Sequence, residues 1–121
     1  MAAREYIFDD GRSLSVRTMY CIGRNYAAHA REMNAEVPTN PIVFLKTETA
    51  YVAPGEDLHI PEYTSNMQHE VELVVVIGED ADNLRIDEAS KVIAGYAVGL
   101  GFDLARPAKR GKAARGAVDT E

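Results

Sequence analysis

The amino-acid sequence predicts a β-rich α+β fold. Extended apolar segments, rich in valine, isoleucine and aromatic residues, account for most of the regular structure that can be assigned. Only two short segments have the composition of helices, and turn signals with glycine or proline separate the segments. The strand candidates are residues 18–22, 42–46, 70–77 and 96–104, residues 58–60 form a short extended segment, and the helix candidates are 26–33 and 88–94.

In the first half of the chain, the strand at 18–22 is closed by Gly23. The helix at 26–33 is predicted from its alanine, arginine, glutamate and methionine residues, which are good helix formers. Residues 37–41 carry two prolines and an asparagine, so they form a loop before the strand at 42–46. Residues 1–16 are interpreted as a short leader with a turn at Asp10-Gly11.

In the second half, residues 70–77 are the clearest strand and stop at Gly78. A polar loop follows, and Asp87 can cap the short helix at 88–94. Gly95 ends this helix, and the chain returns as the strand at 96–104.

Composition excludes several classes of protein. The net charge of −6 argues against general nucleic-acid binding. No apolar run is long enough to span a membrane, and the first ten residues lack the apolar stretch of a signal peptide, which predicts a cytoplasmic protein without a membrane partner. Cys21 is the single cysteine and cannot form an internal disulfide, which fits a reducing compartment.

Two glutamates lie on the clearest strand. Because strand side chains alternate between faces, Glu70 and Glu72 share one face of 70–77. Both faces are otherwise apolar, which predicts a strand buried on both sides. Two neighbouring buried carboxylates are costly, and a bound cation would remove that cost.

The last strand adds a third carboxylate. Its bulky residues alternate with Ala97, Gly99, Gly101 and Asp103, and the three small residues leave space in front of Asp103. Three carboxylates around a cavity suit a hard cation, Mg²⁺ or Mn²⁺. Spacing alone leaves two alternatives open: Glu-x-Glu is more often a solvated strand face, and nothing in the spacing joins Asp103 to the pair.

Several motifs together resemble one known family. They are Cys21-Ile-Gly-Arg-Asn-Tyr-Ala-Ala-His29, Val43-Phe-Leu-Lys46, His69-Glu-Val-Glu-Leu-Val-Val-Val-Ile-Gly78 and Ala94-Gly-Tyr-Ala-Val98. In order and spacing they resemble the fumarylacetoacetate hydrolase family, with the strongest likeness to its small acylpyruvate hydrolase and oxaloacetate decarboxylase type. The resemblance covers residues 17–106 and implies the first half of a mixed β-sandwich or barrel with short helices.

The resemblance also implies roles for individual residues. Glu70, Glu72 and Asp103 would be the metal ligands. His29 and Glu32 fall where the family carries a water-activating pair on a helix, and their spacing of three puts them on one helix face. Without the resemblance, this pair would be interpreted as an ordinary exposed pair. Arg24 and Lys46 would face the substrate, although both could equally be solvated surface groups.

The implied substrate is a small 2-oxo acid with a second carbonyl. Hydrolysis of its carbon–carbon bond, as in an acylpyruvate, is the implied reaction; decarboxylation of oxaloacetate, or hydratase or isomerase chemistry, are the alternatives within the family. The implied assembly is a homodimer. A second hypothesis, from a different class, is a truncated, non-catalytic protein that binds metal or a partner.

Residues 107–121 depart from the family pattern. They carry Lys109, Arg110, Lys112 and Arg115 where the family continues differently, and family members are about twice this length. Read one base later, the codons of Arg106 and the next two residues can encode Asp-Leu-Gln, as the family pattern requires. We therefore hypothesise a frameshift at Arg106, in which case the basic tail is no nucleic-acid-binding patch.

Overall fold

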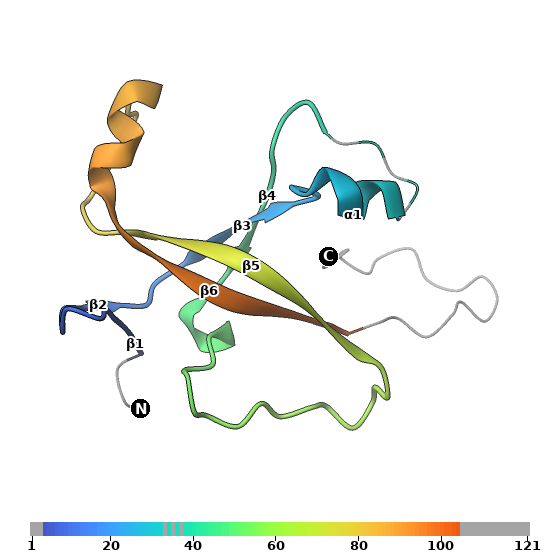
Figure 1. The fold of residues 1–121 in the computed structure, drawn as a ribbon. Coiled ribbons are helices and arrows are strands. Elements are labelled where there is room, and N and C mark those ends of the chain that lie inside the picture. Colours follow the sequence, from blue (N-terminus) through green and yellow to red (C-terminus); the bar gives the residue numbers. More distant parts are fainter. Residues whose placement is uncertain (1–3, 33, 35, 37, 105–121) are drawn as a thin grey trace. The chain divides into compact units, whose positions relative to one another are not determined.

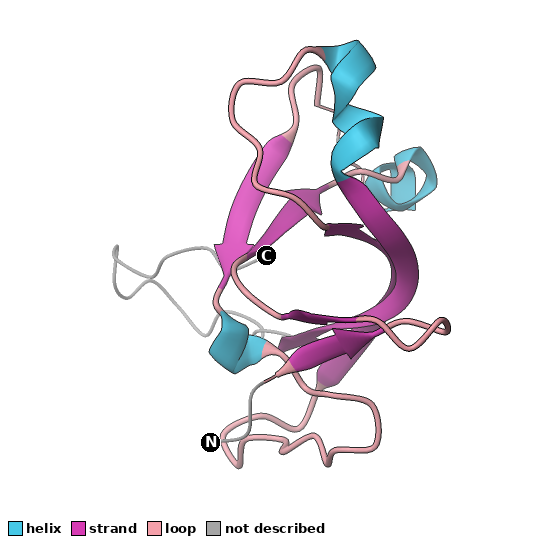
Figure 2. Cartoon of the chain, turned by 90° about the vertical axis from the view of Figure 1, so that its left-hand side faces the viewer, coloured by secondary structure: helices cyan, strands magenta, loops and turns pink. Residues whose placement is uncertain are grey.

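The computed structural model describes residues 4–104, except 33, 35 and 37, and strands account for most of its regular structure (Figure 2). The prediction of a β-rich fold with short helices is therefore confirmed. The chain divides into two units, Met1–Asp57 and Leu58–Glu121, and each is described by itself. The elements are β1 (Glu5–Ile7), β2 (Ser13–Ser15), β3 (Met19–Gly23), α1 (Ala27–Glu32), β4 (Ile42–Lys46), η1 (Glu48–Ala50), β5 (Met67–Ile77), η2 (Ile86–Val92) and β6 (Ile93–Leu104).

The first unit begins with a hairpin that the sequence did not predict. Strands β1 and β2 pair antiparallel around the predicted turn, where Gly11 has φ +86° and donates its N–H to the carbonyl of Phe8. A positive φ is the conformation for which glycine is suited, so the turn at Asp10-Gly11 is confirmed. The extent of the leader, residues 1–16, stays a prediction.

This hairpin is attached to the 3₁₀ turn η1. Arg4 donates from Nη1 to the carbonyl oxygens of Glu48 and Thr49, at 3.2 and 3.3 Å. The rings of Tyr6 and Tyr51 meet edge to face with centroids 5.3 Å apart. Burial, and then the neighbouring Tyr51 and Cys21, raise the pKa of Tyr6 above its usual value. These contacts bind the described part of the predicted leader to the rest of the unit.

The tip of the β1–β2 hairpin carries a pH-sensitive contact. The carboxylate of Asp10 accepts the backbone N–H of Arg12 at 3.0 Å and its Nε–H at 2.7 Å, which lowers the pKa of Asp10. Because the folded-state pKa is depressed, the contribution of this contact is present above the unfolded-state pKa and is lost as pH falls through the lowered value. We expect the amide proton of Arg12 to report an apparent pKa below 3.8 in an NMR titration. Asp10→Asn should abolish that titration and Asp9→Asn should leave it intact; the reverse result would contradict the assignment.

Strands β3 and β4 pair antiparallel from Met19 opposite Lys46 to Gly23 opposite Ile42. Helix α1 follows β3 and confirms the predicted helix with shorter bounds, Ala27–Glu32, since Met33 lies outside the described residues. Ala30 is fully buried, so this position marks the inward face of the helix.

The second unit is a long antiparallel hairpin of β5 and β6, which twist around each other (Figure 1). Both strands begin three residues before their predicted starts, at Met67 and Ile93. At the closed end, Gly78 donates its N–H to the carbonyl of Val92. A Cβ on Gly78 would lie 2.6 Å from the Cβ of Ala94, so this close approach requires glycine.

The segment predicted as a helix at 88–94 is instead the 3₁₀ helix η2, Ile86–Val92. The prediction that Asp87 caps it is wrong: the cap is Arg85, whose backbone N–H is accepted by the Glu88 carboxylate at 3.3 Å. Asp87 accepts the Nε–H of Arg85 at 3.1 Å. The early end at Val92 frees Ile93 and the following residues to extend β6.

The prediction that β5 is buried on both faces is also wrong. Val71 and Leu73 expose 64% and 63% of their surface. Among the described residues, β5 and β6 pair only with each other, and an isolated two-stranded hairpin buries little apolar surface. In the described part of the chain, the buried hydrophobic residues are Val16, Ala30 and Val76.

No helix within the described residues is long and apolar enough to cross a membrane. The predicted tail, 107–121, and the frameshift hypothesis attached to it lie outside the described residues.

Candidate functional site

The register of β5 and β6 brings the three candidate carboxylates to one face. Glu70 pairs with Gly101, Glu72 pairs with Gly99, and Asp103 pairs with Gln68. Directly opposite residues of an antiparallel pair share a face, so Glu70, Glu72 and Asp103 lie on the same side of the hairpin. Asp103 is the diagonal neighbour of Glu70, a relation that typically separates residues by about 7–8 Å. Spacing left this relation open; whether the three residues act as ligands stays a prediction.

Glycines face the two glutamates across the ladder. A Cβ on Gly101 would lie 3.9 Å from Cγ of Glu72, which is ordinary contact distance. A Cβ on Gly99 would lie 2.8 Å from Cγ2 of Val74, which is too close without movement. The space next to the glutamates therefore depends on these two positions, whereas the predicted space in front of Asp103 stays a prediction.

This difference predicts opposite tolerances at the two glycines. Gly99→Ala should lower the free energy of unfolding by about 1 kcal/mol, because the stiff Val74 side chain must move. Gly101→Ala should leave it unchanged or raise it by about 0.5 kcal/mol, since alanine is less costly than glycine within a strand. Urea denaturation of the two variants measures both changes. Equal effects would mean that Val74 does not restrict a side chain at position 99.

The donor set fits a hard divalent cation. Three carboxylates on one face supply the oxygen ligands that Mg²⁺ and Mn²⁺ prefer. Glu70 and Asp103 are exposed and Glu72 is half-buried, so solvent or a substrate can reach all three. Within the described residues, no group of three His, Cys, Asp or Glu side chains converges in the way a bound metal requires. Binding would therefore need side-chain rotation on a backbone whose register already groups the residues.

Helix α1 carries the predicted water-activating pair. His29 and Glu32 are three residues apart within its bounds, as expected from the sequence. The Glu32 side chain is exposed, whereas that of His29 lies outside the described residues. The structure thus places both residues on one helix, and their catalytic roles stay predictions.

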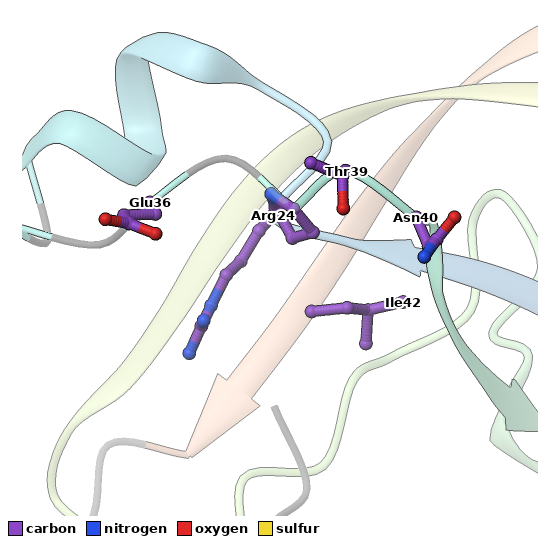
Figure 3. Close-up of a pocket in the computed structure, with 6 residues that line it drawn as sticks. Arg24, Glu36, Thr39, Asn40 and Ile42 are labelled. Atoms are coloured by element: carbon purple, nitrogen blue, oxygen red, sulfur yellow. The ribbon is translucent and has the colours of Figure 1, made fainter.

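Arg24 adopts a rare backbone conformation in the turn after β3. Its φ is +51°, in the left-handed region that non-glycine residues seldom occupy, and such strain often accompanies function. The Nε atom is buried from solvent. The side chain extends between Glu36 and Ile42 in an open depression (Figure 3). The depression is lined by Arg24, Glu36, Pro38, Thr39, Asn40 and Ile42.

The polar residues of this depression were not predicted as site residues. Glu36, Thr39 and Asn40 come from the segment between the first predicted helix and the strand at 42–46, which was interpreted as a connection. Their proximity to Arg24 follows from the pairing of Gly23 with Ile42, which brings both ends of the intervening segment together. The sequence feature that could have indicated this depression is the alternation of polar residues with prolines in this segment.

Lys46 lies away from this depression. It is half-buried and pairs with Met19 at the far end of the ladder from Gly23, the residue before Arg24. Four residue steps along a strand correspond to about 13 Å. The structure therefore does not bring Lys46 and Arg24 together, although both remain candidates for substrate binding. Arg24, His29, Glu32 and Lys46 belong to the first unit, and the three carboxylates belong to the second.

Comparison with known proteins gives a family match over most of the chain. The family model described as fumarylacetoacetate (FAA) hydrolase C-terminal matches residues 18–114. The mitochondrial oxaloacetate tautomerase FAHD1 of Bos taurus is 43% identical over 84 residues, which are 69% of this chain and 38% of that protein. The protein of the same name from Arabidopsis thaliana is 45% identical over 80 residues, covering 66% of this chain and 36% of that protein.

Solved structures of members of the same family also match this chain. Fumarylpyruvate hydrolase from Pseudomonas aeruginosa, in complex with Mn²⁺ and pyruvate, matches with a TM-score of 0.71 and 38% identity over 84% of this chain and 46% of that chain. A candidate fumarylacetoacetate isomerase/hydrolase from Oleispira antarctica matches with a TM-score of 0.73 and 33% identity. This match covers 82% of this chain and 45% of that chain. The family resemblance is therefore confirmed, and the β-rich fold matches part of the fold of these relatives.

The chain spans less than half the length of the relatives it matches. Which part of their fold it corresponds to, expected from the sequence to be the first half, stays a prediction.

Proposed function

Because this chain belongs to the fumarylacetoacetate hydrolase family, we propose that it serves in the divalent-metal-dependent hydrolysis of a carbon–carbon bond in a small 2-oxo acid, such as an acylpyruvate. The observation that carries the proposal is the register of β5 and β6, which groups Glu70, Glu72 and Asp103 on one face opposite glycines. The fumarylpyruvate hydrolase of Pseudomonas aeruginosa, solved with Mn²⁺ and pyruvate, supports both the cation and the substrate class.

Glu70, Glu72 and Asp103 would hold Mg²⁺ or Mn²⁺. When bound, the ion supplies Lewis-acid polarisation of the substrate and offsets the negative charge that develops as the bond breaks. The three carboxylates also bring negative charge to this face, and an anionic 2-oxo acid would be repelled from it without the cation. Substrate affinity should therefore depend on prior occupation by the metal.

The first unit would supply the proton transfers and the cationic groups. His29 would take a proton from water, and Glu32 would orient its imidazole and stabilise the imidazolium. The Arg24 guanidinium has the fixed fork of donors that suits a carboxylate. The neighbouring Thr39 and Asn40 offer further donors in the same depression. Lys46 would act as a second, separate cationic group for the substrate.

The experiment that tests this function is turnover of acetylpyruvate and of oxaloacetate by the purified chain, with Mg²⁺, with Mn²⁺ and with chelator. Acetate and pyruvate formation that requires the cation would support hydrolysis. Metal-dependent loss of carbon dioxide from oxaloacetate would support the decarboxylase alternative. Absence of any turnover at high protein concentration would go against the enzyme proposal.

Tautomerisation is a second candidate reaction. It is favoured by the relatives at 43% and 45% identity, which are oxaloacetate tautomerases. The reaction needs proton transfer at carbon without bond cleavage, and the same base and cation could serve it. Proton NMR of oxaloacetate separates it from hydrolysis, because faster keto–enol exchange would occur without product. Hydratase or isomerase chemistry on a 2-oxo diacid would be recognised in the same spectra.

A non-catalytic, metal- or partner-binding role is the candidate from a different class. Mn²⁺ binding by calorimetry without turnover would support it. The homodimer and the cytoplasmic location stay predictions; sedimentation of the purified chain tests the first and fractionation of cells that express it tests the second.

A further inference from the structure

The depression around Arg24 is lined by side chains of opposite charge. Arg24 supplies a guanidinium and the exposed Glu36 supplies a carboxylate to the same hollow (Figure 3). Thr39 and Asn40 add a hydroxyl and an amide, each of which can donate or accept a hydrogen bond. The volume of the depression is about 430 Å³, within the range of about 300–1,000 Å³ that is usual for small-molecule sites. A molecule of a few carbon atoms therefore fits among these groups.

The backbone fixes the point from which Arg24 enters the depression. Gly23 pairs with Ile42 at the end of the β3–β4 ladder, and a Cβ on Gly23 would lie 3.4 Å from Cγ2 of Ile42. Ile42 thus packs closely against the residue before Arg24. Arg24 itself has φ +51°, a conformation that glycine would adopt without strain. The presence of arginine in this strained position indicates that its guanidinium has a role there.

A plain carboxylate is a poor ligand for this pair of charges. The Arg24 guanidinium attracts it through a planar fork of donors, whereas the Glu36 carboxylate repels it. A ligand with a hydrogen-bond donor beside its carboxylate avoids this conflict, because the donor pairs with Glu36 while the carboxylate pairs with Arg24. The two charges therefore favour a carboxylate with a neighbouring O–H over a carboxylate with a neighbouring carbonyl.

We propose that Glu36 is a specificity-determining residue that selects the enol tautomer of the 2-oxo acid. In the keto form, the oxygen on the second carbon is a carbonyl, which only accepts hydrogen bonds and is repelled by the Glu36 carboxylate. In the enol form, the same oxygen carries a proton and donates it in a hydrogen bond to Glu36. The assignment of a 2-oxo acid as the ligand rests on the proposed function, whereas the preference for an O–H donor rests on Arg24 and Glu36 alone.

A charge-balancing role for Glu36 is the alternative. In that case Glu36 lowers the affinity of every carboxylate alike, because it competes for the Arg24 guanidinium without contacting the neighbouring group of the ligand. Selection of the enol instead changes the ratio of two affinities, for an acid with an O–H and for an acid with a carbonyl. This ratio distinguishes the two roles.

The test compares two small acids that differ only at the second carbon. L-lactate carries an O–H there, as the enol does, and pyruvate carries a carbonyl, as the keto form does. Each acid is titrated into the chain in the presence of chelator, and the NMR signals of the Arg24 Nε–H and the Asn40 backbone N–H report binding. We expect L-lactate to bind about 10-fold more tightly than pyruvate, the lower end of what one hydrogen bond to a charged group provides.

Three variants locate the effect. Glu36→Ala should bring the two affinities to within about 2-fold of each other, because it removes the acceptor for L-lactate and the repulsion of pyruvate. Arg24→Lys keeps the charge and loses the planar fork, so it should weaken both acids by a similar factor. The matched control, Glu5→Ala, removes an exposed glutamate from β1 of the same unit and should preserve the ratio. Circular dichroism reports the folding of each variant.

Several results would overturn the proposal. They are equal binding of the two acids by the original chain, tighter binding of pyruvate, no binding of either acid, or an unchanged ratio in Glu36→Ala. If Glu36→Ala strengthens both acids equally, Glu36 only balances the charge of Arg24 and does not select the enol. The titrations use neither metal nor turnover. A chain without catalytic activity that still prefers L-lactate would therefore contradict the proposed function and leave the role of Glu36 in place.

Discussion

Asp103→Ala is expected to weaken Mn²⁺ and Mg²⁺ binding by about 100-fold or more. Even the removal of groups that only support metal ligands typically costs about 10–100-fold in affinity, and loss of a direct carboxylate ligand should reach at least the upper end of that range. The backbone register makes the prediction specific, because Asp103 lies on the same face as Glu70 and Glu72 and is diagonal to Glu70. Isothermal titration calorimetry of the variant and the original chain measures the change.

The control for this experiment is Asp82→Ala. Asp82 is an exposed carboxylate in the loop between β5 and η2, in the same unit but off the hairpin ladder. The Asp82→Ala substitution removes the same charge as Asp103→Ala, so it measures any general electrostatic effect on cation binding. If Asp103→Ala and Asp82→Ala change the affinity equally, Asp103 is not a ligand. The exposed position of Asp103 at the open end of the hairpin means that the fold should survive the substitution.

His29→Ala is expected to lower turnover of the 2-oxo acid substrate by about 10²- to 10⁴-fold, the usual contribution of a general base. Binding of the cation should be unchanged, because His29 is not one of the three candidate ligands. Initial rates at saturating Mn²⁺ measure the effect. The control is His59→Ala, which removes an exposed histidine to which no role is assigned.

Glu32 is proposed as a positioning residue, so its test needs a readout other than rate alone. Glu32→Gln should lower kcat with little change in KM, because a residue that orients the general base acts on the chemical step and leaves substrate binding unchanged. A loss of activity in which KM changes as much as kcat would indicate a structural role instead.

Local patterns predicted a large part of this fold. Alternation of apolar residues identified β5, and the small residues at 97, 99 and 101 identified the face that Asp103 shares. The helix at α1 was predicted from composition because short-range propensities determine where a helix is locally favourable. The β1–β2 hairpin was missed, since its strands are three residues long and the turn signal alone does not define pairing.

Other features could not be derived from periodicity. The alternation in β5 correctly separated its two faces, but the inference that both are buried was wrong, because burial depends on whether another layer covers each face. The cap of η2 was misassigned by two residues, since Arg85 and Asp87 are both compatible with the local sequence and the Glu88 contact selects between them. The depression around Arg24 required the pairing of β3 with β4, which joins residues distant in sequence.

The sequence by itself determined the family, through four motifs in order, and the strand and small-residue patterns that mark the candidate carboxylates. These are local properties, set by side-chain chemistry and by the alternation of a strand. Only the tertiary structure decided that Gln68 pairs with Asp103, so that the three carboxylates share a face, and that the opposite face of the same hairpin remains exposed. The physical reason is that strand pairing and burial also depend on contacts between segments distant along the chain, which the pattern of one segment does not define.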